Sequence, residues 1–210
     1  MIDQKVFNEN LELLKKLFPQ EFNENLIEVK RKIFYNTETD WEKNICRFTN
    51  KAVRYLLICE APPDNGEYFY SNFNKSLFNK VWETFFSIPK GINSDEAYQY
   101  LADIGFLLVD SLPYSMDYSK ERKRNLPEYD ILVENCLGWW QQKLEDNFII
   151  NDKTIIALGF KINAEKIINI THGKLSHNRT IYPLVKDNIV ADSTERWQPS
   201  IKKLKSVFNP

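Results

Sequence analysis

The feature that most constrains the fold is a nearly continuous apolar run over residues 53–59, which ends at Glu60. Such a run is typical of a strand that is buried on both faces of a parallel sheet. Pro62 and Pro63 follow closely, and because proline cannot donate a backbone hydrogen bond, the strand must end before them. Glu60 is therefore predicted to lie at the carboxyl end of a central strand.

Three further apolar runs predict more strands of the same sheet, at residues 106–109, 154–158 and, more weakly, 188–191. Helical periodicity lies between and after them, at residues 76–86, 95–102, 128–147, 164–170 and 200–207. Strands that alternate with helices are typical of a doubly wound sheet. We predict an α/β three-layer sandwich with a central, mostly parallel sheet of about four strands, flanked by helices.

The N-terminal part of the sequence predicts two amphipathic helices, because apolar side chains recur at helical spacing on both sides of Pro19. No internal repeat, low-complexity linker or shift in composition divides the chain. We therefore expect one domain over residues 1–210, with residues 1–50 as its N-terminal helical part.

Charge and motif content exclude several classes of protein. The net charge of −1 argues against a polybasic DNA coat, although it leaves room for a local basic groove. The sequence has no glycine-rich phosphate loop and no C-x-x-C pair, so neither a cofactor nor a metal is expected. No apolar segment approaches the ~20 residues of a membrane span, which predicts a soluble, cytoplasmic protein without a membrane partner.

Three acidic residues follow predicted strands directly: Glu60, Asp110 and Asp192. Ligands of open parallel sheets bind beyond the carboxyl ends of the strands, so these side chains are candidates for one site. A carboxylate at a buried strand end is costly unless it has a partner or a function. The alternative is that each acid only caps the loop or helix that follows it.

The segment that contains Glu60 resembles the first motif of the uracil-DNA glycosylase superfamily, in which a hydrophobic strand ends in Gly-Glu-Ala-Pro-Gly. Glu60, Ala61 and Pro62 match the centre of this motif, while Cys59 and Pro63 replace its two glycines. The resemblance implies a DNA glycosylase that flips a base out of the stack. It also implies a catalytic Glu60 that stabilises positive charge on the sugar or orients water, with Ala61 at the base and Pro62 at the DNA strand.

Weaker similarities extend this resemblance over residues 53–160. The segment 66–70 is similar to the family's loop that carries a base-stacking aromatic, for which we favour Phe69 over Tyr70. Residues 106–110 resemble the strand that ends in the family's base-recognising asparagine, and residues 154–159 resemble its Ala-Leu-Gly strand.

Two features of the family are missing. The four cysteines of its iron–sulfur branch are absent, so no cluster is carried over, and no His-Pro-Ser motif follows the fourth predicted strand. At that point we expect Asp192 to assist the leaving base and Ser193 to contact a phosphate, although both are also ordinary residues at a helix start. The two histidines, His172 and His177, follow no convincing strand and are expected to be solvated.

Basic residues are the candidates for phosphate contacts. The segment 114–127 is the longest polar, positively charged stretch and predicts an exposed loop. Lys123 from this loop and Arg196 from the C-terminal part are expected to bind the DNA backbone. Ordinary solvated surface charge is the alternative.

Asp110 stands where the family has asparagine, and this difference bears on the base that is removed. An asparagine amide suits uracil because it both accepts and donates, whereas an ionised aspartate only accepts. Acceptance from an amino group is the usual way in which proteins recognise cytosine.

Excision of ordinary cytosine would destroy the host genome, so we predict a modified cytosine, such as one in phage DNA, removed in defence or repair. The alternatives are a uracil-DNA glycosylase, a nucleoside hydrolase, or a non-catalytic nucleic-acid-binding protein on the same fold. DNA is the expected partner of a monomer that needs no other protein.

Overall fold

A computed structural model describes residues 4–63, 68–73, 77–116, 121–177, 180–191 and 200–208. At its centre lies a three-stranded parallel sheet with the order β2-β1-β3. The strands are β1 (Tyr55–Cys59), β2 (Phe106–Asp110) and β3 (Ile155–Leu158). The three stronger strand predictions are thus confirmed, and the register pairs Cys59 with Asp110, so both strands end at the same edge of the sheet.

The fourth predicted strand is reduced to a single parallel bridge between Leu158 and Ile189. The backbone N–H of Val190 donates to Leu158 over 2.9 Å, but the preceding residues form a short 3-10 helix, η3 (Lys186–Asn188). The side chain of Asn188 donates to the carbonyl oxygen of Ile156 over 2.9 Å, where a further strand residue would otherwise pair. Among the described residues, the parallel sheet therefore has three strands, one fewer than the four or so that the sequence predicted.

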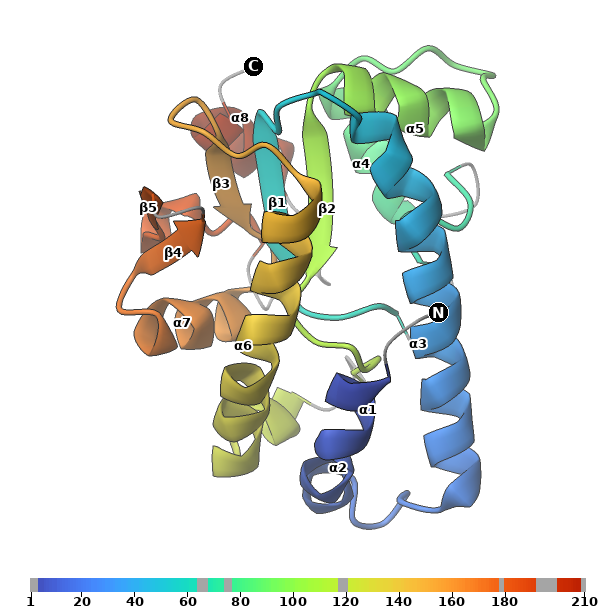
Figure 1. The fold of residues 1–210 in the computed structure, drawn as a ribbon, viewed down its shortest axis with the longest axis vertical. Coiled ribbons are helices and arrows are strands. Elements are labelled where there is room, and N and C mark those ends of the chain that lie inside the picture. The colour runs from blue at the N-terminus through green and yellow to red at the C-terminus, as the bar shows by residue number, and fades with distance from the viewer. Residues whose placement is uncertain are drawn as a thin grey trace.

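Helices cover both faces of the sheet, as the α/β prediction requires (Figure 1). In the view of Figure 1, α6 (Pro127–Asn147) lies in front of the sheet, and α4 (Leu77–Phe85) and α8 (Ile201–Phe208) lie behind it. Tyr55 and Phe106 pack against the rear layer through ring contacts with Phe86 and Phe208. Sequence periodicity predicted each of these three helices.

The remaining helices surround this centre. They are α1 (Lys5–Glu9), α2 (Leu11–Leu17), α3 (Glu24–Ile45), α5 (Ser94–Asp103) and α7 (Lys161–Ile170). The long α3 is capped by Asn23, whose side chain accepts from the backbone N–H of Leu26, and it runs from Glu24 to Ile45. Within the described residues, no helix is both long and apolar enough to cross a bilayer.

A small hairpin was not predicted from the sequence. Strands β4 (Lys174–His177) and β5 (Thr180–Pro183) pair antiparallel beside α7. Their short length and polar residues give little strand signal. The expectation that His177 is solvated is wrong, because its side chain lies on the inner face of β4 and is buried, which lowers the pKa of the imidazole.

Tyr70 closes the open side of β2. Its hydroxyl accepts from the backbone N–H of Leu108 over 3.0 Å and donates to the carbonyl oxygen of the same residue over 3.3 Å. The ring is buried against Phe69 and Tyr98. Tyr70 therefore satisfies backbone groups of a strand that has a neighbouring strand on only one side.

Candidate functional site

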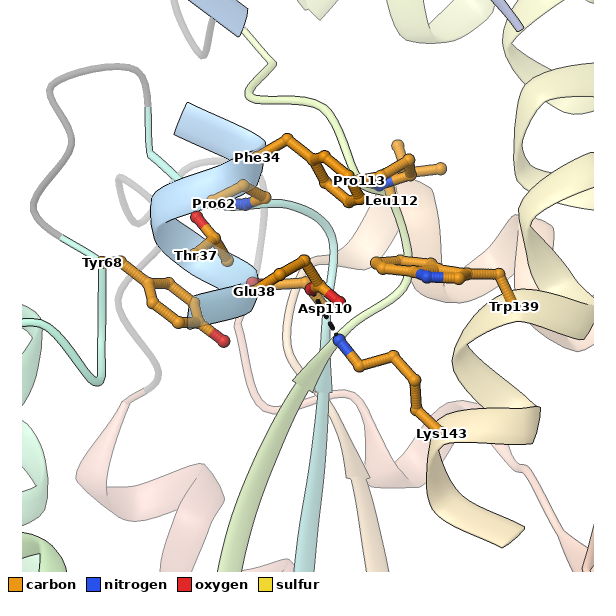
Figure 2. Close-up of a pocket in the computed structure, with 10 residues that line it drawn as sticks. All are labelled: Phe34, Thr37, Glu38, Pro62, Tyr68, Asp110, Leu112, Pro113, Trp139 and Lys143. Carbon is orange, nitrogen blue, oxygen red and sulfur yellow. Dashed lines mark hydrogen bonds and ion pairs between the residues drawn. The ribbon is translucent and has the colours of Figure 1, made fainter. Parts of the chain in front are cut away.

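A narrow pocket lies where β1 and β2 end, between α3 and α6 (Figure 2). Ten residues line it: Phe34, Thr37, Glu38, Pro62, Tyr68, Asp110, Leu112, Pro113, Trp139 and Lys143. The empty space of the pocket, together with its opening to solvent, is about 210 Å³. The interior is too narrow to hold a water molecule. A ligand can therefore enter only if lining side chains move.

Asp110 is the most unusual group of the pocket. Its side chain is 7% exposed, and its Oδ2 atom has no hydrogen-bond partner among the described residues. Burial raises the pKa of this carboxyl to about 7, while the nearby Lys143 ammonium opposes the rise. At neutral pH the carboxyl therefore exchanges between its acid and its ionised form, which is a property of groups that bind or transfer protons.

A largely buried ion pair lies beside Asp110 and joins the two helices of the pocket. Lys143 of α6 donates to Glu38 of α3 over 2.7 Å. The ammonium also lies 4.4 Å from the ring centroid of Trp41 and 4.5 Å from that of Trp139. Figure 2 shows the lysine side chain extending from α6 toward the two carboxylates. Burial lowers the pKa of Lys143, and the charge of Glu38 opposes this change.

Glu60 does not line this pocket. Its carboxylate forms a two-point ion pair with Arg124, with Oε1 2.6 Å from Nε and Oε2 2.8 Å from the terminal nitrogen. Tyr129 of α6 donates a second hydrogen bond to Oε1, also over 2.6 Å. Both side chains of the ion pair are almost fully buried. The expected strand-end position of Glu60 is confirmed, but both of its oxygens already have strong partners.

The partners of Glu60 continue into a polar network that spans several elements. Asn163 of α7 donates to the hydroxyl of Tyr129 over 3.1 Å. The hydroxyl of Ser111 lies 3.1 Å from both Asn163 Oδ1 and the backbone oxygen of Glu60. This network connects the ends of β1 and β2 to α6 and α7. It thereby holds in place the strand ends beside which the pocket lies.

Among the aromatic residues of the motif-like segment 66–70, the one that lines the pocket is Tyr68. The favoured stacking residue, Phe69, is buried among Tyr98 and Phe106, and Tyr70 is held at β2. For either Phe69 or Tyr70 to stack on a ligand, that residue would have to leave the core. Of the other motif residues, Pro62 lines the pocket, whereas Ala61 is buried beside it.

In the described part of the basic segment, residues 125–127 are exposed as its composition predicted, but several other residues are not. Tyr114, Ser115, Met116 and Arg124 are buried. Tyr114 donates to α1, Ser115 accepts from Lys30 of α3, and Arg124 is the partner of Glu60. Lys123 binds Glu21 over 3.1 Å and lies over the ring of Phe18 at 3.4 Å. A phosphate contact by Lys123 would have to replace these interactions. Asp192, Ser193 and Arg196 lie outside the described residues.

Comparison of the chain with protein-family models, with curated proteins and with solved structures found no match. The function must therefore be argued from the pocket itself. Among the described residues, no group of three or more histidine, cysteine or acidic side chains is arranged to hold a metal ion.

Sequence reasoning missed the two charged helix residues of the pocket, Glu38 and Lys143, because neither follows a strand. One signal was available for Lys143, which stands four residues after Trp139 and therefore shares a helix face with it. The same signal marks Glu38, which follows Phe34 by four residues and precedes Trp41 by three, so that it shares a helix face with two aromatic residues.

The charge of Asp110 should make the protein less stable as the pH rises. Folding raises the pKa of this carboxyl from 3.8 to about 7, so the folded state holds a proton that the unfolded state releases in that interval. The resulting stabilisation is complete below about pH 4 and is lost as the pH rises through about 7. At 1.36 kcal/mol per tenfold change, the full effect is about 4 kcal/mol.

Urea denaturation of the wild type and of Asp110→Asn at several pH values measures this effect. Because all other titrating groups are shared, the difference between the two proteins isolates Asp110. We expect the stability of the variant relative to the wild type to increase from about pH 4 to about pH 8. A difference that stays constant over this range would show that Asp110 is ordinarily ionised in the folded state.

Proposed function

We propose that this protein is a DNA glycosylase that hydrolyses the N-glycosidic bond of a flipped base, and that the base is a modified cytosine. The observation that carries the proposal is the Oδ2 atom of Asp110, buried in the pocket without a hydrogen-bond partner in the described part of the chain. A buried acceptor without a partner costs about 1–3 kcal/mol, so a ligand that donates to it is favoured.

The charge state of Asp110 supports an amino-bearing base. The ionised carboxylate only accepts hydrogen bonds, which suits the N4 amino group of cytosine. Uracil presents an acceptor, O4, at the same place and would require the protonated acid. Because the pKa of the Asp110 carboxyl lies near 7, an amino-bearing ligand favours its ionised form. Binding of uracil instead requires the carboxyl to take up a proton.

The pocket walls support a planar ligand. Tyr68 and Trp139 provide aromatic faces on opposite sides of Asp110 in Figure 2, and Phe34 lies above. Aromatic faces hold flipped bases by stacking, as in other enzymes that act on extruded nucleotides. A base does not fit the pocket as it stands, so binding must separate these rings.

The reaction breaks the bond between C1′ of the sugar and the ring nitrogen of the base, whose electron pair leaves with the base. A water oxygen bonds to C1′, and the proton released from that water neutralises the departing base. Positive charge develops on the sugar, and a nearby carboxylate stabilises it. Glu60 is assigned this electrostatic role, which requires the carboxylate to exchange Arg124 for the substrate, because the guanidinium otherwise neutralises its charge.

Incubation of the purified chain with duplexes that carry one uracil, one cytosine or one 5-substituted cytosine tests the proposal directly. Alkali then cleaves the abasic sites that a glycosylase leaves. We expect strand breaks at a modified cytosine and few at uracil or unmodified cytosine. Equal cleavage at uracil and modified cytosine would contradict the base assignment, and intact strands throughout would contradict the activity.

A non-catalytic nucleic-acid-binding protein is the second candidate. It is favoured by the saturated carboxylate of Glu60, since both oxygens are occupied by Arg124 and Tyr129. The same duplexes distinguish the two functions, because tight binding that leaves every strand intact would support the binding protein.

A further inference from the structure

Lys143 is the one cation among the ten described residues that line the pocket. An ammonium group has three N–H donors. One of them is used by Glu38 at 2.7 Å, and the other two have no hydrogen-bond partner in the described residues. The pocket thus combines the Oδ2 atom of Asp110, a buried acceptor without a donor, with the ammonium group of Lys143, two of whose N–H donors make no hydrogen bond to the described residues.

This pairing of groups matches one edge of a cytosine ring. Along that edge the N4 amino group, a donor, is followed by the acceptors N3 and O2. Uracil instead carries a proton on N3, so an ammonium group there would face a donor with another donor. A carboxylate and an ammonium side by side therefore select cytosine through two contacts, only one of which depends on Asp110.

The chemistry of base removal gives the ammonium a second use. When the bond to the sugar breaks, its electron pair leaves with the base, and negative charge spreads onto the ring oxygen O2 and nitrogen N3. A donor fixed at that position stabilises the transition state more than the ground state, and this difference accelerates the reaction. Arg124, a buried cation, is already bound to Glu60 and does not line the pocket.

We infer that Lys143 donates a hydrogen bond to the N3 and O2 edge of the flipped cytosine and stabilises the negative charge of the departing base. This inference rests on the proposed glycosylase function. The ion pair with Glu38 and the contacts with Trp41 and Trp139 hold the ammonium in place before substrate arrives. Preorganisation of this kind lowers the cost of solvent rearrangement during the reaction.

The test is the rate of base release by Lys143→Met, measured on duplexes whose cytosines carry different 5-substituents. We expect kcat to fall about 10²–10³-fold, as for other lost transition-state donors. The fall should be largest for bases that are poor leaving groups and smallest for 5-fluorocytosine, whose ring accepts negative charge more readily. Lys143→Arg keeps a cation and should recover part of the rate.

Lys30→Met is the matched control, because Lys30 is also buried on the inner side of α3, where it donates to Ser115 and lies over Phe18, but it does not line the pocket. Misfolding lowers the active fraction equally for all substrates, so it cannot change the dependence on the leaving group. Equal losses for all bases in Lys143→Met, or no loss, would overturn the inference and leave the proposed function intact. A wild type that cleaves none of the duplexes would overturn both.

Discussion

Replacement of Arg124 by methionine is expected to lower the free energy of unfolding by about 3–5 kcal/mol, because it leaves the Glu60 carboxylate buried without its cation. The ion pair is nearly inaccessible to solvent, so water cannot replace the lost guanidinium. Among the described residues, Tyr129 alone would remain as a hydrogen-bond partner of the carboxylate. The measurement is urea denaturation at neutral pH, with the slope of the transition compared between variants.

Two variants sharpen this result. Lys51→Met removes the partner of Asp103 in an ion pair that is largely exposed, and it should cost less than about 1 kcal/mol. The double variant Glu60→Met, Arg124→Met removes both buried charges and should be more stable than Arg124→Met alone. If Arg124→Met costs no more than Lys51→Met, the buried pair does not stabilise the fold.

Under the proposed glycosylase function, exchange of Asp110 for asparagine is expected to reverse the base preference. The amide both donates and accepts, so it suits uracil and loses the second acceptor for an amino group. One correctly matched base contact is worth about 1–3 kcal/mol, so cleavage of modified cytosine should fall about 10–100-fold relative to uracil. The measurement is kcat/KM on matched duplexes that differ only in the target base.

The pH dependence provides an independent check on the same residue. In the wild type, the preference for modified cytosine over uracil should increase as the pH rises through about 7, because the ionised carboxylate becomes the dominant form. In Asp110→Asn the preference should not change with pH. Asp103→Asn, at an exposed site, is the matched control. An unchanged base preference in Asp110→Asn would exclude Asp110 from base recognition.

The positions of Glu60 and Asp110 were predictable because each follows an apolar run that must be a buried strand. Parallel strands end at one edge, so their proximity followed from the fold class alone. Their partners were not predictable. Arg124 lies in a segment whose composition indicates solvent exposure, and only the three-dimensional path of the chain brings it to Glu60.

The direction of the two carboxylates also lay beyond sequence reasoning. Neighbouring positions in a strand point to opposite faces, and the turn after β1 then decides where Glu60 is aimed. A motif match therefore located the residue but not its surroundings. The same limitation explains Phe69, whose place in a motif-like loop suggested contact with a base, whereas its ring packs against Tyr98 and Phe106.

The hydroxyl of Tyr70 has a consequence for how the molecule meets other copies of itself. A strand with unpaired backbone groups on one side is a template on which another chain can add a strand, and such pairing leads to aggregation. Because Tyr70 occupies both backbone groups of Leu108 with one side-chain atom, β2 cannot recruit a foreign strand at its midpoint. The edge of this three-stranded sheet is therefore protected at its centre from pairing with a strand of another molecule.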